Sequence, residues 1–356
     1  MPRIVACETA RPPHRVIQEE ARDFAARLFR EALPDLDRLL PVFENTTIRE
    51  RAFCVPAQWF ETSRGFVEKN RIYVERGVEL AEEAARAALG AARLDARDVD
   101  HVFFVSTTGI ATPSLDAHLF NRLGFSPGIR RTPLWGLGCA GGLAGLIRAS
   151  EWLRAYPRRT ALVVALELCG LTFIRNDLSR ENFVATSLFG DGCGAAVLAG
   201  DEADLPAGGA GGLGIEAVGS VTWPDTLDVM GWDVAEEGLR VIFAKSIPQI
   251  VSQSARPAIE EFLAGHGAAL AEVRHFLAHP GGARVIAAYR EALGFSEDQC
   301  ADMREVLARN GNMSSATILY VMASFLASGR GVAGDLVLSA ALGPGFSSEF
   351  MLSRCL

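Results

Sequence analysis

The sequence predicts a layered α/β protein made of two similar halves. Helix-like and strand-like segments alternate along most of the chain, as in sheets covered by helices. Segments 140–147 and 313–328 are apolar on nearly all sides, which predicts helices buried between two sheets. A long repeat supports the two halves, because three residue pairs stand 174 positions apart: Val99 with Val273, His101 with His275, and Val105 with His279.

The length of the chain agrees with this division. A chain of 356 residues exceeds the usual size of a single hydrophobic core. We place the two halves at residues 1–205 and 206–356, and the glycine-rich stretch from Pro206 to Gly214 is the predicted junction. Helices predicted over 79–90 and 257–267 each lead into the equivalent strand of their half.

Composition excludes several classes of protein. The formal net charge of −8 argues against nucleic acid as a partner, because phosphate binding needs a basic face. The seven cysteines contain no C-x-x-C pair, which fits neither a disulfide framework nor a zinc site. No apolar run reaches the ~18 residues of a membrane span, and the first residues lack the pattern of a signal peptide. We therefore expect a cytoplasmic protein without a metal or transmembrane segment.

Cys139 is the first candidate for chemistry. The stretch "LWGLGCAGGLAGL" sets it among five glycines at the start of a predicted helix. The amide groups at a helix N-terminus favour a thiolate, and glycines permit a tight turn around it. The alternative is an inert cysteine buried in the core.

His279 and Asn312 are the candidate partners. His279 ends a strand just before "PGG", although it could simply be satisfied by a main-chain carbonyl. Asn312 in "RNGNMSSAT" could be an ordinary helix N-cap. The repeat places Asn312 or Met313 opposite Cys139, so the predicted symmetry brings a cysteine, a histidine and an asparagine toward one point.

Five motifs stand in order along the chain: "GCAGG" at Gly138, "LFGDG" at Leu188, "AHPGG" at Ala278, "GNMSS" at Gly311 and "GPGF" at Gly343. Together they resemble the type III polyketide synthases, the chalcone-synthase-like branch of the thiolase superfamily. The resemblance implies a thiolase-like, five-layered αβαβα fold, a homodimer, and a catalytic triad of Cys139, His279 and Asn312.

The resemblance also implies an acyltransferase that performs repeated decarboxylative Claisen condensations. Cys139 would take an acyl group from an acyl-CoA starter. His279 and Asn312 would stabilise the enolate formed from malonyl-CoA, as an oxyanion hole does. Coenzyme A thioesters are then the substrates, and no further cofactor is expected.

Cavity residues are carried over by position. Phe189 matches the gatekeeper phenylalanine of the family, and the second gatekeeper position holds Val241, which opens that wall. The other positions so implied are Thr112, Cys169, Thr172, Trp232 and Ser314, with Gly343, Pro344 and Gly345 as the loop of the cyclisation pocket.

Few of the positions that hold CoA-binding basic residues in the family hold a basic residue in this sequence. Only Arg38 falls on a matching basic position, where the other two positions are Pro41 and Asn45. Arg49 and Arg51 are close enough in sequence to substitute, unless they are ordinary solvated arginines.

Three further stretches look like the bacterial alkylpyrone and alkylresorcinol synthases: "VFENTTIRERAF", "WFETSRGFVEKNRIYVE" and "VMGWDV". They imply a medium-to-long-chain fatty acyl starter and an alkylpyrone product. An alkylresorcinol-forming enzyme, a single-condensation enzyme like ketoacyl-ACP synthase III, and a non-catalytic binding protein with this fold remain alternatives. The context "AHPGG" favours the polyketide synthase over the ketoacyl synthase.

Overall fold

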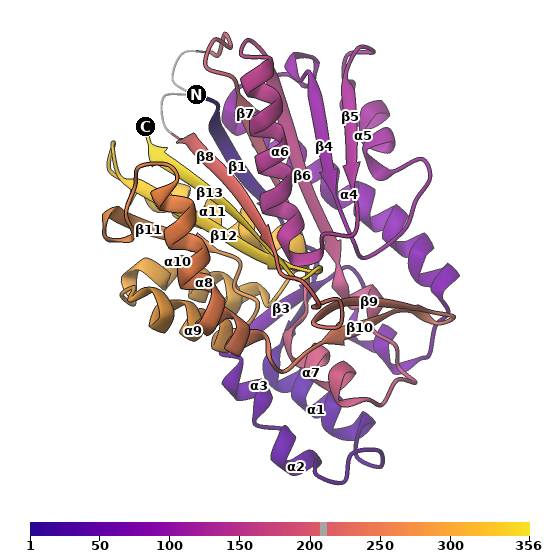
Figure 1. Cartoon of the computed structure of the whole chain (residues 1–356). Coiled ribbons are helices and arrows are strands. Elements are labelled where there is room, and N and C mark those ends of the chain that lie inside the picture. The colour runs from indigo at the N-terminus through magenta and orange to yellow at the C-terminus, as the bar shows by residue number, and fades with distance from the viewer. Residues whose placement is uncertain (207–211) are drawn as a thin grey trace.

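One nine-stranded mixed sheet organises the molecule. The structure is a computed structural model that describes residues 1–206 and 212–356. Its strands are β1 (Arg3–Ala10), β4 (His101–Val105), β5 (Arg130–Leu134), β6 (Thr160–Leu168), β7 (Asp191–Ala199), β8 (Leu213–Thr222), β11 (Val273–Ala278), β12 (Leu336–Gly343) and β13 (Ser347–Cys355). The order across the sheet is β11-β12-β13-β8-β1-β7-β6-β4-β5 (Figure 1).

The predicted duplication is visible in the strand pairing. In the first half β4 is parallel to β6, while β6–β7 and β7–β1 are antiparallel. In the second half β11 is parallel to β12, while β12–β13 and β13–β8 are antiparallel. A short ladder between β1 and β8, which pairs Arg3 with Gly214 and Ile4 with Leu213, joins the two sets. Strand β5 extends the first set only.

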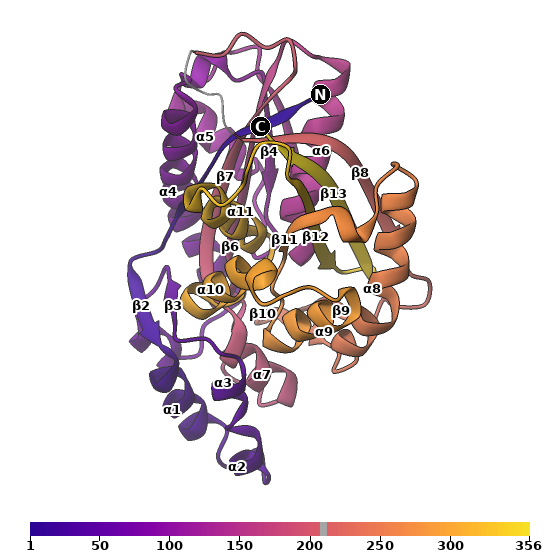
Figure 2. The ribbon, with the colours of Figure 1, turned by 90° about the vertical axis from the view of Figure 1, so that its left-hand side faces the viewer.

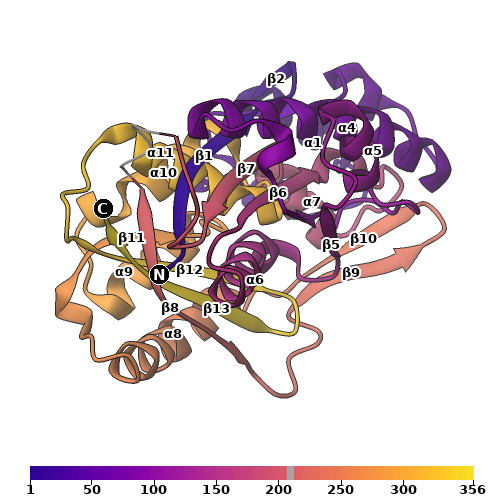
Figure 3. The same cartoon turned by 90° about the horizontal axis from the view of Figure 1, so that it is seen from above.

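Two apolar helices form the central layer. Helix α6 (Gly141–Ala155) contacts β4 and β6 of the first half and β12 and β13 of the second (Figure 3). Helix α11 (Thr317–Ser328) contacts β1, β7 and β11. The two helices approach so closely that a side chain at Gly142 would lie 2.1 Å from the carbonyl oxygen of Ser315.

The outer helices complete a five-layered αβαβα arrangement, in which the two halves of the single sheet form the two β layers. Helices α4 (Phe66–Ala92) and α5 (Leu115–Leu123) lie on the side of the first half, where α4 contacts β1, β6 and β7. Helices α8 (Ile247–Ala264), α9 (Ala283–Leu293) and α10 (Ala301–Asn310) belong to the second half. The predicted fold class is therefore confirmed, whereas the boundary between residues 205 and 206 stays a prediction.

The register of the repeat differs from the prediction at the central helices. The 3-10 turn η3 (Gly138–Ala140) leads into α6, and η7 (Ser314–Ala316) leads into α11. Each of these pairs begins 176 positions apart, because the connection from strand to helix is two residues longer in the second half. The counterpart of Cys139 is therefore Ser315, not Asn312 or Met313.

A lobe extends beyond the sheet at the end opposite the two termini, at the bottom of the view in Figure 2. It contains α1 (Gln18–Leu28), α2 (Leu36–Leu39), α3 (Val42–Asn45), α7 (Arg180–Leu188) and the pair β2 (His14–Ile17) and β3 (Glu50–Phe53). The ring of Phe183 packs edge-to-face on Phe29 and Phe43, with centroids 5.4 and 5.7 Å apart. The hairpin of β9 (Met230–Ala235) and β10 (Gly238–Phe243) lies next to α7.

The remaining elements are short 3-10 helices: η1 (Ala57–Glu61), η2 (Ala96–Asp98), η4 (Cys169–Thr172), η5 (Leu270–Glu272) and η6 (Asp298–Cys300). Two predicted helices are longer than expected. Helix α4 begins at Phe66 rather than at 79, and α8 begins at Ile247 and runs through Pro257. Pro257 is tolerated because it lies on the exposed face, where water can bond the carbonyl that loses its partner.

Most of the predicted junction between the halves lies in residues 207–211, outside the described residues. None of the helices in residues 1–206 and 212–356 has both the length and the apolarity of a membrane span.

Candidate active site

Cys139 lies in a tight turn where the two halves meet. It occupies the middle of η3 and is 5% exposed. Gly138 before it has a left-handed φ of 46°, and a side chain there would lie 2.6 Å from Cδ of Pro344. The thiol donates a hydrogen bond to Oγ of Ser314 at 3.5 Å. The glycines thus allow the turn to pack directly against the "GPGF" loop of the second half.

The amide group of Asn312 is fixed at both ends. Its Oδ1 accepts a hydrogen bond from the main-chain N of Ser314 at 2.8 Å, and its Nδ2 donates to the carbonyl oxygen of Gly281 at 3.2 Å. Asn312 is buried, and a hydrogen bond from it acts on the Cys139 thiol. The residue therefore does hold the turn before α11, as a capping asparagine does, while it also borders the thiol.

His279 follows β11 and is held by its main chain. Its main-chain N donates to the carbonyl oxygen of Ala340 at 2.8 Å, and its own carbonyl accepts from Gly281 at 3.0 Å. The ring is 3% exposed, and neither ring nitrogen has a hydrogen-bond partner among the described residues. Buried polar groups are normally paired, so two unpaired ring nitrogens in one buried side chain mark His279 as a candidate functional residue.

Burial dominates the ionisation of both groups. It raises the pKa of Cys139 to about 12, against hydrogen bonds from Ser314 and Asn312 that lower it. Burial lowers the pKa of His279 to about 3. Each charge taken alone is therefore disfavoured, and the predicted helix-terminus effect does not by itself yield a thiolate.

A buried carboxyl group lies near the Cys139 thiol. Glu167, in β6, is fully buried and accepts hydrogen bonds from the hydroxyls of Thr107 (2.9 Å), Thr108 (2.8 Å) and Ser315 (2.5 Å). Burial raises the pKa of Glu167 to about 7, and its charge contributes to the raised pKa of Cys139. The sequence analysis missed this cluster, although a lone glutamate inside the apolar run "TALVVALEL" was its visible signal.

Two aromatic side chains and one aliphatic side chain lie next to one another between the end of α7 and the β9–β10 hairpin. The ring of Phe189, at the end of α7, lies 6.2 Å from the ring of Trp232 on β9. Trp232 faces Val241 across the β9–β10 hairpin. Phe189 and Val241 also line a cavity of about 670 Å³, together with Cys169 and Thr172.

This cavity is lined by both apolar and charged side chains. The residues that line it between α1, β3, η1 and η4 include Phe24, Phe53, Phe60, Phe173 and Ile174. Charged residues such as Arg27, Glu61 and Arg240 also line it, and all three are exposed. Its volume lies in the ~300–1,000 Å³ range of small-molecule sites.

Family models match nearly the whole chain. The N-terminal domain of chalcone and stilbene synthases matches residues 3–202, and the C-terminal domain matches residues 217–356. The chain belongs to the chalcone and stilbene synthases. It is thus an acyltransferase-type condensing enzyme of the type III polyketide synthase family.

Individual relatives of the synthase cover its full length. It is 42% identical to a putative chalcone synthase of Bacillus subtilis, over 98% of this chain and 97% of the relative. It is 28% identical to the alpha-pyrone synthesis polyketide synthase-like Pks18 of Mycobacterium tuberculosis, over 96% of this chain and 88% of the relative. The crystal structure of 1,3,6,8-tetrahydroxynaphthalene synthase from Streptomyces coelicolor superposes with a TM-score of 0.93 at 31% identity, covering 99% of both chains.

The structure brings most of the predicted site residues of the synthase together. Ser314 bonds Cys139, and Gly343 lies so close to the Cys139 turn that a side chain there would be 2.5 Å from the carbonyl oxygen of Leu137. Thr112 is the exception. It is exposed in the loop after β4 and is not among the residues that line the cavity, so it does not face the site of its own chain.

The arginines expected to bind CoA fall into three different environments. Arg38 is exposed on α2. Arg49 pairs with Glu305 at 3.0 Å on the surface. Arg51 is 2% exposed and donates to main-chain carbonyls, so it cannot be the surface phosphate ligand that the sequence predicts. In the described part of the synthase, no three metal-ligating side chains are grouped closely enough to hold an ion.

Proposed function

We propose that the synthase extends a medium-to-long-chain fatty acyl-CoA starter with malonyl-CoA and closes the product to an alkylpyrone. One observation supports the starter: Phe189, Val241 and Cys169 line a 670 Å³ cavity that also holds a group of apolar side chains, Phe24, Phe53, Phe60, Phe173 and Ile174. An aliphatic chain bound there leaves water, and that transfer is favourable at roughly 0.8 kcal/mol per methylene. An aromatic or malonyl starter would leave most of this space unfilled.

The first step loads the starter onto Cys139. The thiol passes its proton to His279 as the sulfur attacks the thioester carbonyl of the acyl-CoA. The carbon–sulfur bond to coenzyme A breaks, and the departing CoA thiolate takes the proton from His279. The acyl group is then held on Cys139, and we place its alkyl chain in the cavity past Cys169, a lining residue close to Cys139.

The second step forms the new carbon–carbon bond. Malonyl-CoA loses carbon dioxide, and the electron pair of the broken bond moves onto its thioester oxygen as an enolate. Hydrogen bonds from His279 and from Nδ2 of Asn312 stabilise that oxygen. The enolate carbon attacks the acyl-Cys139 thioester, and Cys139 leaves as a thiolate that is ready for another round.

We assign closure of the product to a pyrone from the proposed fatty acyl starter and from the similarity to a known synthase. A relative named for alpha-pyrone synthesis supports a pyrone. The 1,3,6,8-tetrahydroxynaphthalene synthase is a similar structure, and it favours a second candidate function, formation of a tetrahydroxynaphthalene. Alkylresorcinol formation and a single condensation are the other possible outcomes of the same chemistry.

We further propose a homodimer that works in the cytoplasm, as the family resemblance implies. The edge strand β5 supports an assembly, because in the described residues it pairs with β4 on one side only and several of its residues are exposed. Size-exclusion chromatography with light scattering tests the dimer.

Product analysis tests the proposed function. The purified protein is given malonyl-CoA with acyl-CoA starters of six to twenty carbons, and the products are identified by mass spectrometry. We expect alkylpyrones, with the highest kcat/KM for the longer starters. Products made only from malonyl or aromatic starters would overturn the starter assignment, and resorcinols would overturn the pyrone.

A further inference from the structure

Arg51 is among the largest fully buried side chains of the protein. It is 2% exposed, although a charged group this deep needs compensating partners. Burial lowers the pKa of Arg51 to about 10, and the neighbouring Asp191 carboxylate opposes that shift. The guanidinium is thus cationic at neutral pH, inside the protein and close to the cavity.

Its hydrogen bonds go to the end of α7. One guanidinium nitrogen, Nη1, donates to the carbonyl oxygens of Thr186 and Phe189, both at 2.8 Å. The last carbonyls of a helix lack partners within the helix and carry partial negative charge, so a cation there is stabilising. Arg51 therefore fixes the main chain of Phe189, whose ring faces Trp232.

The same segment is joined to Asn312. The main-chain N of Asn312 donates to the carbonyl oxygen of Leu188 at 2.9 Å, and its carbonyl accepts from Gly190 at 3.0 Å. Gly311, with a left-handed φ of 69°, lies against the Arg51 stem: a side chain there would be 2.8 Å from its Cδ. Arg51 thus contacts both sides of the joint between Phe189 and Asn312.

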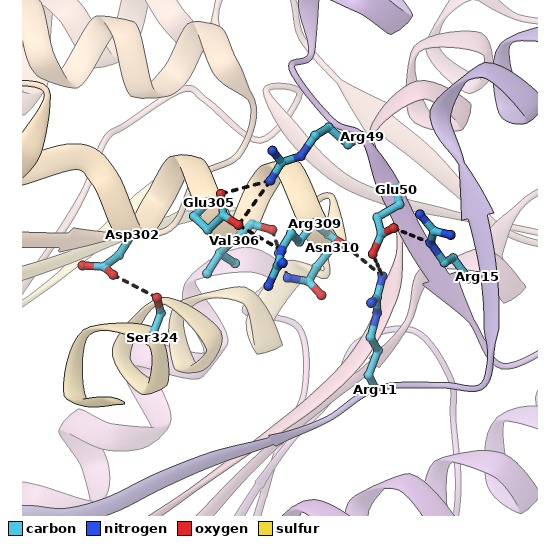
Figure 4. A network of polar contacts seen from close by, with 10 residues as sticks. All are labelled: Arg11, Arg15, Arg49, Glu50, Asp302, Glu305, Val306, Arg309, Asn310 and Ser324. Atoms are coloured by element: carbon cyan, nitrogen blue, oxygen red, sulfur yellow. Dashed lines mark hydrogen bonds and ion pairs between the residues drawn. The ribbon is translucent and has the colours of Figure 1, made fainter. Parts of the chain in front are cut away.

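Strand β3 also anchors the helix that precedes Asn312 (Figure 4). The main-chain N of Arg49 donates to the carbonyl oxygen of Ala308 at 2.7 Å. Arg11 donates to the carbonyl oxygen of Arg309 at 3.0 Å and to Glu50 at 2.8 Å. Arg49, just before β3, and Arg11 therefore fix the end of α10, while the Arg51 side chain of β3 fixes the end of α7.

We propose that Arg51 is a positioning residue for the condensation reaction. It sets the gatekeeper ring of Phe189 and the amide group of Asn312 at one fixed separation, through the main-chain bridge between them. The inference rests on the proposed function in one respect, because it requires Asn312 to stabilise the enolate. Arg51 itself makes and breaks no bond.

Substitution of Arg51 separates this role from CoA binding. For Arg51→Met we expect kcat of malonyl-CoA decarboxylation to fall roughly 10- to 100-fold, since small misplacements of a catalytic group cost about that much. KM for malonyl-CoA should stay within about twofold, because no phosphate contact is lost. Alkylation of Cys139 by iodoacetamide should change much less than decarboxylation, because Arg51 makes no hydrogen bond to Cys139 or Ser314.

Three further variants serve as controls for this comparison. Arg256→Met is the matched control, because Arg256 also donates to a main-chain carbonyl, that of Ala292, but at the surface. It should behave as wild type. Arg51→Lys keeps a buried cation and should recover part of the lost kcat. If Arg51→Met does not fold, Arg51→Lys and Gly311→Ala carry the test, since Gly311→Ala disturbs the same joint from the opposite side.

Several results would overturn the inference. They are an unchanged kcat in Arg51→Met, a raised KM at unchanged kcat, or an equal fall of decarboxylation and Cys139 alkylation that reflects a general loss of structure. The proposed starter fails separately. If the wild type decarboxylates malonyl-CoA but rejects fatty acyl-CoA, only the starter assignment falls, and the Arg51 comparison is still decided by decarboxylation.

Discussion

Glu167 accepts a hydrogen bond from Ser315, the residue that occupies in the second half the position that Cys139 occupies in the first. The two central helices thus begin with different chemistry at equivalent places: one presents a thiol, and the other holds a buried carboxyl group beside that thiol. Because the charge of Glu167 raises the pKa of Cys139, the protonation of Glu167 affects the nucleophile.

Glu167 should make the stability of the protein depend on pH. Burial raises its pKa from 4.5 to about 7, so between these values the folded protein holds a proton that the unfolded chain has lost. The stability contributed by protonated Glu167 is complete below pH 4.5 and disappears as the pH rises to about 7. Relative to Glu167→Gln, the wild type should lose up to about 3 kcal/mol of unfolding free energy across this range. Urea unfolding of both proteins at a series of pH values measures it, and parallel curves would contradict it.

The same substitution should activate the thiol. Glu167→Gln removes a negative charge that raises the pKa of Cys139, so the thiolate becomes more accessible. We expect faster alkylation of Cys139 by iodoacetamide in Glu167→Gln than in the wild type above pH 7, where the wild-type carboxylate is charged. Peptide mass spectrometry assigns the modified cysteine. Equal rates at all pH values would show that Glu167 does not act on the thiol.

The sequence predicted that Cys139 lies against the second half of the chain, because the order of the motifs and the repeat both reflect the topology of the fold. It did not predict where Arg51 points. Arg49 comes just before β3 and Arg51 lies on it, and a spacing of two residues in an extended segment predicts the same face for both. In the fold, Arg51 is buried against the end of α7, whereas Arg49 is exposed and pairs with Glu305 of α10. The two-residue longer connection before α11 likewise has no local signal, so Cys139 was aligned with the wrong partner.

Close packing of the central helices predicts a large effect of one methyl group. In Gly142→Ala the new Cβ would lie 2.1 Å from the carbonyl oxygen of Ser315, so α6 and α11 must move apart. We expect a loss of about 1–3 kcal/mol or more of unfolding free energy. Gly90→Ala is the control, because no atom lies within 4 Å of the new Cβ in α4, and it should be neutral or stabilising by about 0.5–1 kcal/mol. Thermal or urea unfolding distinguishes the two, and similar shifts would refute the contact.

Asn312→Ala should separate decarboxylation from loading. Loss of one oxyanion donor typically lowers kcat by ~10²–10³, and we expect that fall in malonyl-CoA decarboxylation. Acylation of Cys139, followed by intact-protein mass spectrometry, should be much less affected, because Asn312 is assigned to the enolate. Asn176→Ala, at an exposed asparagine, is the control. An equal loss of both partial reactions would place Asn312 in a purely structural role, as the cap of the turn before α11.

Val241→Phe should shift the synthase toward short starters. Val241 lines the cavity and faces Trp232, so an added ring fills the opening next to Phe189. Ile242→Phe is the matched control, because neighbouring strand residues point to opposite faces and Ile242 is not among the cavity residues. In Val241→Phe the ratio of kcat/KM for sixteen-carbon to six-carbon acyl-CoA should fall by tenfold or more, as about 1–3 kcal/mol of apolar contact corresponds to a 10- to 200-fold change. If both variants keep the wild-type ratio, the starter chain does not pass Val241 and the 670 Å³ cavity is not its site.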